Sequence, residues 1–372
     1  MTNLSELRLW ANNITDISPL SNLTQLSWLD LSFNNVSDIS SLGGLTNLTE
    51  LLLRGNPLSS SSINDHIPSF KRSGVTVYFD SFRVGSNFDI ELVFLDDDFT
   101  QVEKRIIQYA ARRWMSIIRD DLPDYTFTQG WSRVCDDHSA IPSGERIDDL
   151  RIYVTSFYAF SPLGFASTSL LRDTSLLPVS GCMSLNLQPR RSYYSTPVWR
   201  YYYYDSSADL LYTALHEIGH VLGIGIVWED LGFVQDPNGD AHFNGPLAIA
   251  AFNDAGGQDY TGAKVPLEKD LSHWRLLPIH HVNPLLSEEL MALVGGKALS
   301  AITIQSLADL GYSVDVTQAD PYTLPDIAAK ASAKIAAPST HAQPEWSCGA
   351  GQAQEPIYVV DSQGRIVRTI SP

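Results

Sequence analysis

The residues best suited to chemistry form the run His216–His220, which reads His-Glu-Ile-Gly-His. Apolar side chains recur around it at helical spacing, at Leu211, Leu215, Ile218 and Leu222. On a helix, the two histidines lie one turn apart, so both imidazoles can reach one metal ion. Glu217 lies between them in angle and can reach a water beside the metal without being a ligand. The motif therefore predicts metal-assisted hydrolysis with Glu217 as general base.

Two imidazoles do not complete a catalytic zinc site, which takes three protein ligands and leaves one position open. Gly223 follows the motif and lets the chain leave the helix abruptly, towards the metal. Glu229 lies too close to the motif to be the third ligand, so we expect a downstream histidine. The candidates are His242, His273, His280 and His281.

Two later segments resemble the leishmanolysin-like zinc peptidases of the metzincin clan. In that family the third histidine lies beyond an insertion, in a Ser-His-Trp context ahead of a Leu-Met turn. This chain reads Ser-His-Trp at 272–274 and Glu-Leu-Met at 289–291. The resemblance covers about residues 86–325. It implies one catalytic Zn²⁺ held by His216, His220 and His273, with Met291 in the Met-turn beneath it.

The same resemblance implies a function and a substrate site. The expected activity is that of an endopeptidase, in which a zinc-activated water attacks a peptide bond. The strand at 164–171 should be an edge strand, to which an extended peptide adds beside the zinc. Its substrate-binding residues would be Gly164, Phe165, Ala166 and Ser167.

The elements expected around this site give an α+β fold. Alternating apolar residues predict strands at 88–95, 150–154, 164–171 and 182–187. Thr100 and Glu103 form a capping-box pattern at the start of a helix that reaches about residue 118. A mixed sheet packed against an active-site helix, followed by the Met-turn, is the metzincin-type arrangement that we expect for 86–325.

The N-terminal region carries a different signal, a repeat of 22 residues. The pattern L-x-x-L-x-L-x-x-N occurs three times, beginning at Leu4, Leu26 and Leu48. It is the leucine-rich repeat, and with its Asp-Ile pairs it resembles the internalin-type subclass. We expect a solenoid over 1–80 with a cap at 63–79. Its concave face would present Trp10, Trp28 and Leu52 to a protein partner.

Composition limits the partners and the compartment. With 25 basic and 42 acidic residues the net charge is −17, which argues against nucleic acid as a partner. No apolar run reaches the length of a membrane helix. The resemblance implies an extracellular or cell-surface protein. The chain begins inside the repeat register without a signal peptide, so we expect it to be N-terminally incomplete.

Other features leave alternatives open. The stretch Asp236–Asp240 has the alternating oxygens of a calcium loop but lacks a distal glutamate, so a Ca²⁺ site and a polar turn both stay possible. Cys135 and Cys182 can pair in an oxidising compartment, which leaves Cys348 over. Residues 326–372 read as a linker and a terminal hairpin. The alternative function is that of an adhesion or recognition protein with a silent or accessory peptidase domain.

Overall fold

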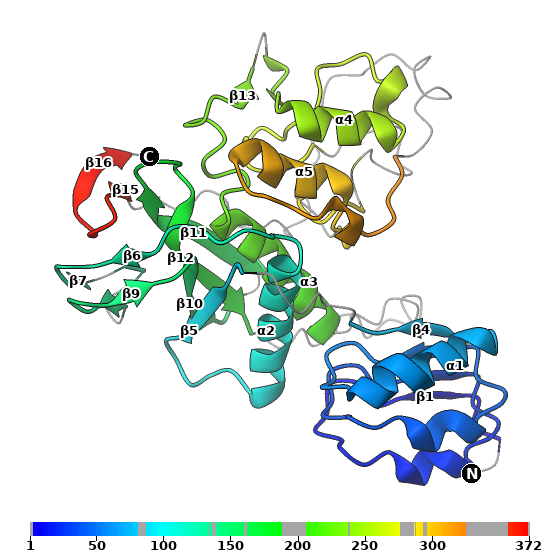
Figure 1. The fold of residues 1–372 in the computed structure, drawn as a ribbon. Helices are drawn as coiled ribbons and strands as arrows, with labels where there is room; N and C mark the ends of the chain where they lie inside the picture. Colours follow the sequence, from blue (N-terminus) through cyan, green and yellow to red (C-terminus); the bar gives the residue numbers. More distant parts are fainter. Residues whose placement is uncertain are drawn as a thin grey trace. The chain divides into compact units, whose positions relative to one another are not determined.

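The computed structural model describes residues 3–80, 87–132, 134–135, 139–159, 162–187, 206–236, 239–275, 286, 288–292, 296–324 and 356–370. The chain divides into two compact units (Figure 1). The first unit is Met1–Arg83 with Phe99–Tyr109, and the second is Val84–Asp98 with Ala110–Pro372. Within the described residues no helix has the length and apolar character needed to cross a bilayer.

The first unit is built on a parallel sheet of short strands, in the order β1-β2-β3-β4. The strands are β1 (Glu6–Arg8), β2 (Trp28–Asp30), β3 (Glu50–Leu52) and β4 (Thr76–Tyr78). Their central residues are in register and point into the core, where Leu29 and Leu51 are fully buried. Short helical turns, η1 (Ser18–Asn22), η2 (Ser40–Gly44) and η3 (Ser62–His66), return the chain from strand to strand, and α1 (Ile67–Arg72) precedes β4.

The repeated asparagines hold the turns of this unit. Asn34 is fully buried, and its Nδ2 donates to the carbonyl oxygens of Leu9 (2.8 Å) and Leu31 (2.9 Å). Its Oδ1 accepts from the backbone N–H of Ile14 at 3.1 Å. A turn in which backbone groups cannot pair with each other needs such a side chain, because buried polar groups without partners are costly.

The second unit contains a six-stranded mixed sheet in the order β16-β15-β11-β12-β10-β5. These strands are β5 (Ile90–Phe94), β10 (Leu150–Phe157), β11 (Gly164–Arg172), β12 (Pro178–Asn186), β15 (Ile357–Val360) and β16 (Ile366–Ile370). β10 runs parallel to β5 and β12, β11 is antiparallel to β12, and β15 is parallel to β11. The sheet is therefore mixed, as the sequence predicts.

The hairpin of β15 and β16 belongs to this sheet rather than to a separate module. β15 pairs with Leu170–Arg172 of β11, and the turn between the two strands accepts a hydrogen bond from Trp131 Nε1 at Gly364 O (2.9 Å). The turn also packs on the small antiparallel pairs β6 (Tyr125–Thr126) with β9 (Arg146–Ile147) and β7 (Trp131–Ser132) with β8 (Ala140–Ile141). The expected domain end at residue 325 is thus too early.

One helix covers this sheet, and two others extend the unit. α2 (Gln101–Met115) is divided between the two units after Tyr109, and it begins with the expected capping box, in which Thr100 N donates to Glu103 Oε2 at 2.7 Å. α3 (Ser206–Val221) lies against β11 and β12 (Figure 1). α4 (Pro246–Asp254) and α5 (Ala301–Leu310) pack side by side beyond it, with the short turns η6 (Gly257–Asp259) and η7 (Val316–Gln318) and the pair β13 (Val234–Gln235) and β14 (His242–Phe243).

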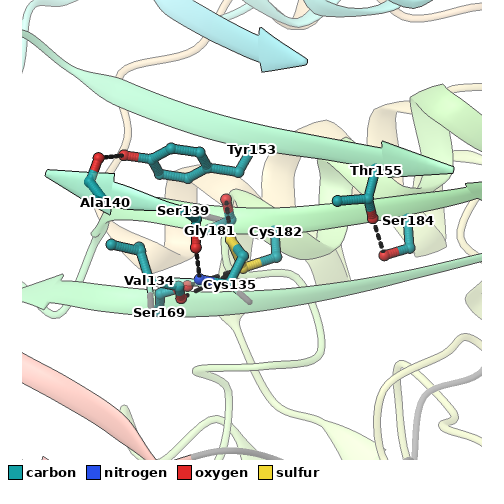
Figure 2. The surroundings of a disulfide bond; sticks show 10 residues. All are labelled: Val134, Cys135, Ser139, Ala140, Tyr153, Thr155, Ser169, Gly181, Cys182 and Ser184. Atoms are coloured by element: carbon teal, nitrogen blue, oxygen red, sulfur yellow. Dashed lines mark hydrogen bonds between the residues drawn. A yellow bond between two sulfur atoms is a disulfide. The ribbon is translucent and has the colours of Figure 1, made fainter. Parts of the chain in front are cut away.

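A disulfide joins Cys135 to Cys182 of β12, with the two Cα atoms 5.6 Å apart. Figure 2 shows it beside the hydroxyl of Ser139, which accepts a hydrogen bond from the Cys135 backbone N–H at 2.6 Å. The bond fixes the loop after β7 to the middle of the sheet. Cys348 lies outside the described residues.

Candidate metal centre

The structure brings His216, His220 and His273 together. Their Nε2 atoms lie 3.0 Å (216–220), 3.1 Å (220–273) and 3.2 Å (216–273) apart. All three side chains are buried. The first two project from α3, and the third comes from the irregular segment after α4, more than fifty residues later. This is the set that the resemblance implies.

The opposite ring nitrogens fix the tautomer of each histidine. His216 Nδ1 contacts the carbonyl oxygen of Leu290 at 2.7 Å, and His220 Nδ1 contacts that of Ile224 at 2.8 Å. His273 Nδ1 contacts Asp270 Oδ2 at 2.8 Å. A carbonyl oxygen or a carboxylate can only accept, so each Nδ1 must carry the proton. Each Nε2 is then an acceptor, and no Nε2 can donate to another.

Three acceptor nitrogens facing one another fit a cation. Tetrahedral zinc, with Zn–N bonds of about 2.0–2.1 Å, holds its nitrogen ligands about 3.3 Å apart. The observed separations of 3.0–3.2 Å are close to that value. Burial and the neighbouring imidazoles lower the pKa of His216, and burial and His273 together lower that of His220 to about 3. The rings of His216 and His220 are therefore neutral, which is the form that binds metals.

Two glycines explain how the chain after α3 reaches the site. Gly223 has φ +110°, a left-handed conformation that ends the helix and presents the Ile224 carbonyl to His220. Gly225 has φ +73°, and a Cβ placed there would lie 2.4 Å from the carbonyl oxygen of Ser272. The bare backbone at Gly225 thus lets the segment that carries His273 approach α3.

Met291 is fully buried, and it follows Leu290, whose carbonyl oxygen contacts His216 Nδ1. A Cβ on Gly219, the glycine within the motif, would lie 2.8 Å from Met291 Sδ. Because Gly219 has no side chain, the Met291 thioether can pack directly against the backbone of α3. The thioether thus packs against the helix that carries His216 and His220, where a soft apolar group needs no bond to a metal.

Glu217 is almost fully buried, at 1% exposure. Within the described residues neither of its carboxyl oxygens has a hydrogen-bond partner. Burial raises its pKa to about 8 in the metal-free chain. A nearby dication would favour the ionised form instead, because opposite charges stabilise a carboxylate. A buried acid next to three clustered imidazoles that could hold a metal ion is the arrangement expected of a general base.

The start of β11 borders this carboxyl group. A Cβ on Gly164 would lie 2.8 Å from Glu217 Oε1, so the strand backbone passes directly beside it. One edge of Gly164–Ser167 pairs with β12. Within the described residues no strand pairs with the other edge of this stretch. The expectation of an edge strand is wrong, however, for the second half of β11, where β15 pairs with Leu170–Arg172.

Asp270 is a site residue that the sequence reading missed. Its Oδ2 accepts from His273 Nδ1, and its Oδ1 accepts from the Ser272 backbone N–H at 3.0 Å. Burial would raise the pKa of Asp270, but the hydrogen bonds to His273 and Ser272 outweigh it and hold the pKa below its usual value. Carboxylates that orient metal-binding histidines in this way are common. The spacing Asp-x-x-His at 270–273 is the signal that points to it.

The competing candidates lie elsewhere or cannot be placed. His242 is in β14, where its Nδ1 contacts the Asp240 carbonyl at 2.8 Å. His280 and His281 fall outside the described residues. Asp240 uses both carboxylate oxygens on the protein itself, contacting Arg275 Nη1 at 2.8 Å and the Ala263 backbone N–H at 3.4 Å. In the described part of that loop, no cluster of oxygen atoms has the arrangement of a calcium site.

The repeat unit offers a different kind of surface. Trp10, Trp28 and Leu52 are all half-buried rather than exposed. The Arg8 guanidinium lies over the Trp28 ring, 5.1 Å from its centroid, and covers part of the expected apolar patch. Tyr78, in register with Leu52 on the next strand, is 39% exposed and has Arg54 over its ring. The face is thus aromatic and charged rather than apolar.

Comparisons with known proteins concern this N-terminal region. Residues 2–58 match the family model described as "Leucine rich repeat". Among solved structures, the chain is similar to an internalin C2 of Listeria monocytogenes at 29% identity, over 21% of this chain and 43% of that one, with a TM-score of 0.18.

A second solved structure, an internalin (inlF) of the same organism, is 28% identical over 30% of this chain and 40% of its own, with a TM-score of 0.20. This chain therefore spans less than half the length of either protein. Comparison with curated proteins gives no match. The family match confirms the repeat prediction, and residues 2–58 form a leucine-rich repeat array.

Proposed function

We propose that this chain is a zinc-dependent endopeptidase of the metzincin kind, joined to a leucine-rich repeat array that binds a protein partner. One observation supports the peptidase above all. The Nε2 atoms of His216, His220 and His273 lie 3.0–3.2 Å apart while every Nδ1 faces an acceptor. When bound, zinc would supply a Lewis acid that activates water and polarises a carbonyl.

The protein's own groups supply the proton transfers. Glu217, with no hydrogen-bond partner for its carboxyl oxygens among the described residues, would take a proton from the attacking water. It would then pass that proton to the leaving amine of the cleaved peptide. Gly164 lies beside this carboxyl group, and an extended substrate could pair with the edge of Gly164–Ser167 that no strand in the described part of the chain occupies.

The repeat array supports the second half of the proposal. Solenoids of this kind use an extended concave surface for recognition. The strands β1 to β4 present Arg8, Asp30 and Tyr78 on one face, which suits a polar protein surface with aromatic contacts. The Cys135–Cys182 disulfide favours an oxidising compartment, and so an extracellular or cell-surface location.

A second function has its own support. The family match concerns only the repeats, which favours a recognition protein whose metal centre is silent. In that case the histidines could still bind zinc, but Glu217 would serve no catalytic purpose. The intact set of ligands and base favours the peptidase.

Metal content and cleavage, measured on the same preparation, test the proposal. We expect the full chain to bind one zinc ion and to cleave an unfolded protein substrate, with a chelator abolishing cleavage and added zinc restoring it. One zinc without cleavage would favour the recognition protein. A chain that binds no zinc would refute the metal centre itself.

A further inference from the structure

Glu289 is a fully buried acid that has no part in the proposed chemistry. Its Oε2 accepts from the Met291 backbone N–H at 2.6 Å. Its Oε1 accepts from Ser300 Oγ at 2.7 Å and from Thr303 Oγ1 at 2.6 Å. A buried carboxyl group is costly unless it is hydrogen-bonded, so one that is bonded on both oxygens holds its surroundings in a single arrangement.

The peptide group between Leu290 and Met291 links this acid to a proposed metal ligand. Its N–H donates to Glu289, and its C=O accepts from His216 Nδ1 at 2.7 Å. The peptide is planar, so fixing its N–H also fixes the direction of its carbonyl. Hydrogen bonds in such a chain polarise one another, so the acid at one end makes the carbonyl a stronger acceptor.

A second branch reaches the segment of the third histidine. Thr303 Oγ1 donates to Glu289 and accepts from Trp274 Nε1 at 2.8 Å. The Trp274 backbone N–H in turn donates to the Met291 carbonyl at 3.1 Å. Trp274 follows His273 directly, so the acid ties the Met-turn to the strand-like segment that carries the third imidazole.

We propose that Glu289 is a positioning residue of the metal centre, which acts through the Leu290–Met291 peptide to hold His216 as the Nδ1–H tautomer with Nε2 directed at the metal. This inference rests on the proposed metal centre. It gives His216 the same kind of support that Asp270 gives His273 directly, with a peptide group inserted between acid and imidazole.

Glu289→Gln in the full chain tests it, because the amide keeps the size but must present a donor where an acceptor is needed. We expect zinc affinity, measured by chelator competition, to fall about 10–100-fold, as for other groups that support metal ligands. Nitrogen NMR of labelled histidines in the metal-free protein should show His216 losing its pure Nδ1–H form. The signals of His220 should not change.

The matched control is Asp149→Asn, which alters another fully buried acid whose oxygens accept from the Leu122 and Asp89 backbone N–H groups. We expect it to lower stability and to leave zinc affinity within about twofold, since no metal ligand depends on it. Equal zinc affinity in Glu289→Gln and Asp149→Asn, with an unchanged His216 tautomer, would overturn the inference.

A failure of the proposed function can be distinguished from a failure of the inference about Glu289. If the parent chain binds no zinc, the proposed function fails, and the His216 tautomer in Glu289→Gln alone decides the inference. If Glu289→Gln does not fold, Thr303→Val and Thr303→Ser decide it. The valine lacks the hydroxyl that donates to Glu289 and should lower zinc affinity, whereas the serine keeps this hydroxyl and should keep zinc affinity. Equal zinc affinity in the two variants would refute the role of Glu289.

Discussion

The repeat array and the metal centre are stabilised by contacts of opposite character. In the array, a contact recurs at a fixed sequence distance: Asn34 Nδ2 reaches the Leu9 carbonyl and Asn56 Nδ2 reaches that of Leu31, both at 2.8 Å. In the metal centre, every histidine has a different acceptor from a different segment. The array repeats one kind of contact along the chain, whereas the centre depends on contacts that occur once.

The largest expected effect is the loss of the third ligand. We expect His273→Ala to lose both zinc and peptidase activity, since a three-ligand site cannot hold the ion with two imidazoles. His242→Ala should keep both, because that ring lies in β14 and contacts the Asp240 carbonyl. Zinc content by elemental analysis separates the two variants.

His280→Ala and His281→Ala should also keep the metal. Retention of tightly bound zinc in His273→Ala would refute the assignment of this residue and, with it, the metzincin interpretation of the chain.

The next effect concerns the base and should leave the metal in place. Glu217→Gln should retain one zinc ion and lower the turnover number by about 10²–10⁴-fold, the usual range for removing a general acid–base group. Steady-state cleavage of an unfolded protein, normalised to zinc content, measures it. Full activity in this variant would show that the carboxyl group takes no proton.

A smaller effect concerns the close contact between the segment after α3 and the segment that carries His273. Gly225→Ala adds a Cβ 2.4 Å from the Ser272 carbonyl oxygen, whereas Gly232→Ala adds one in open space at a similar positive φ. The left-handed backbone alone costs about 1–2 kcal/mol for alanine. We expect Gly232→Ala to lose roughly that much stability and Gly225→Ala to lose more, together with zinc affinity. Denaturant unfolding and chelator competition measure the two quantities.

The variant with the smallest expected effect on the metal centre lies in the array. Asn34→Ala should lower its stability by roughly 2–4 kcal/mol, because several buried backbone groups lose their partners. Asn12→Ala is the matched control: this asparagine is exposed, so the cost should be below about 1 kcal/mol. Neither variant should alter zinc affinity. Equal destabilisation by both would show that burial does not decide the strength of the asparagine contacts.

The sequence alone predicts structural features that repeat along the chain and contacts between residues within one turn of a helix. The 22-residue period predicts the spacing of β1, β2 and β3, which begin 22 residues apart, because each repeat contacts the same kind of neighbour. His216 and His220 are close in any helix. His273 was selected among four histidines by family resemblance, since no local property of the residue itself indicates which distant histidine returns to α3.

The features that the sequence did not reveal all depend on distant partners. Gly225 reads as an ordinary turn glycine until Ser272 is seen to pack on it. The sequence places Glu289 two residues before Met291 without indicating a role for it, because its partners Ser300 and Thr303 lie at the start of α5. The hairpin of β15 and β16 alternates like many others, and only its pairing with β11 shows to which sheet it belongs.

The pairing of β15 with β11 also affects the order in which the fold forms. β11 and β15 are separated by about half of the chain, and contacts that close such long loops form late and slowly. As the polypeptide is synthesised from its N-terminus, β11 emerges first, then α3 and His273, and β15 only afterwards. The histidines can therefore gather before the sheet is complete, and the outer edge of Leu170–Arg172 stays open to mispairing until the hairpin arrives.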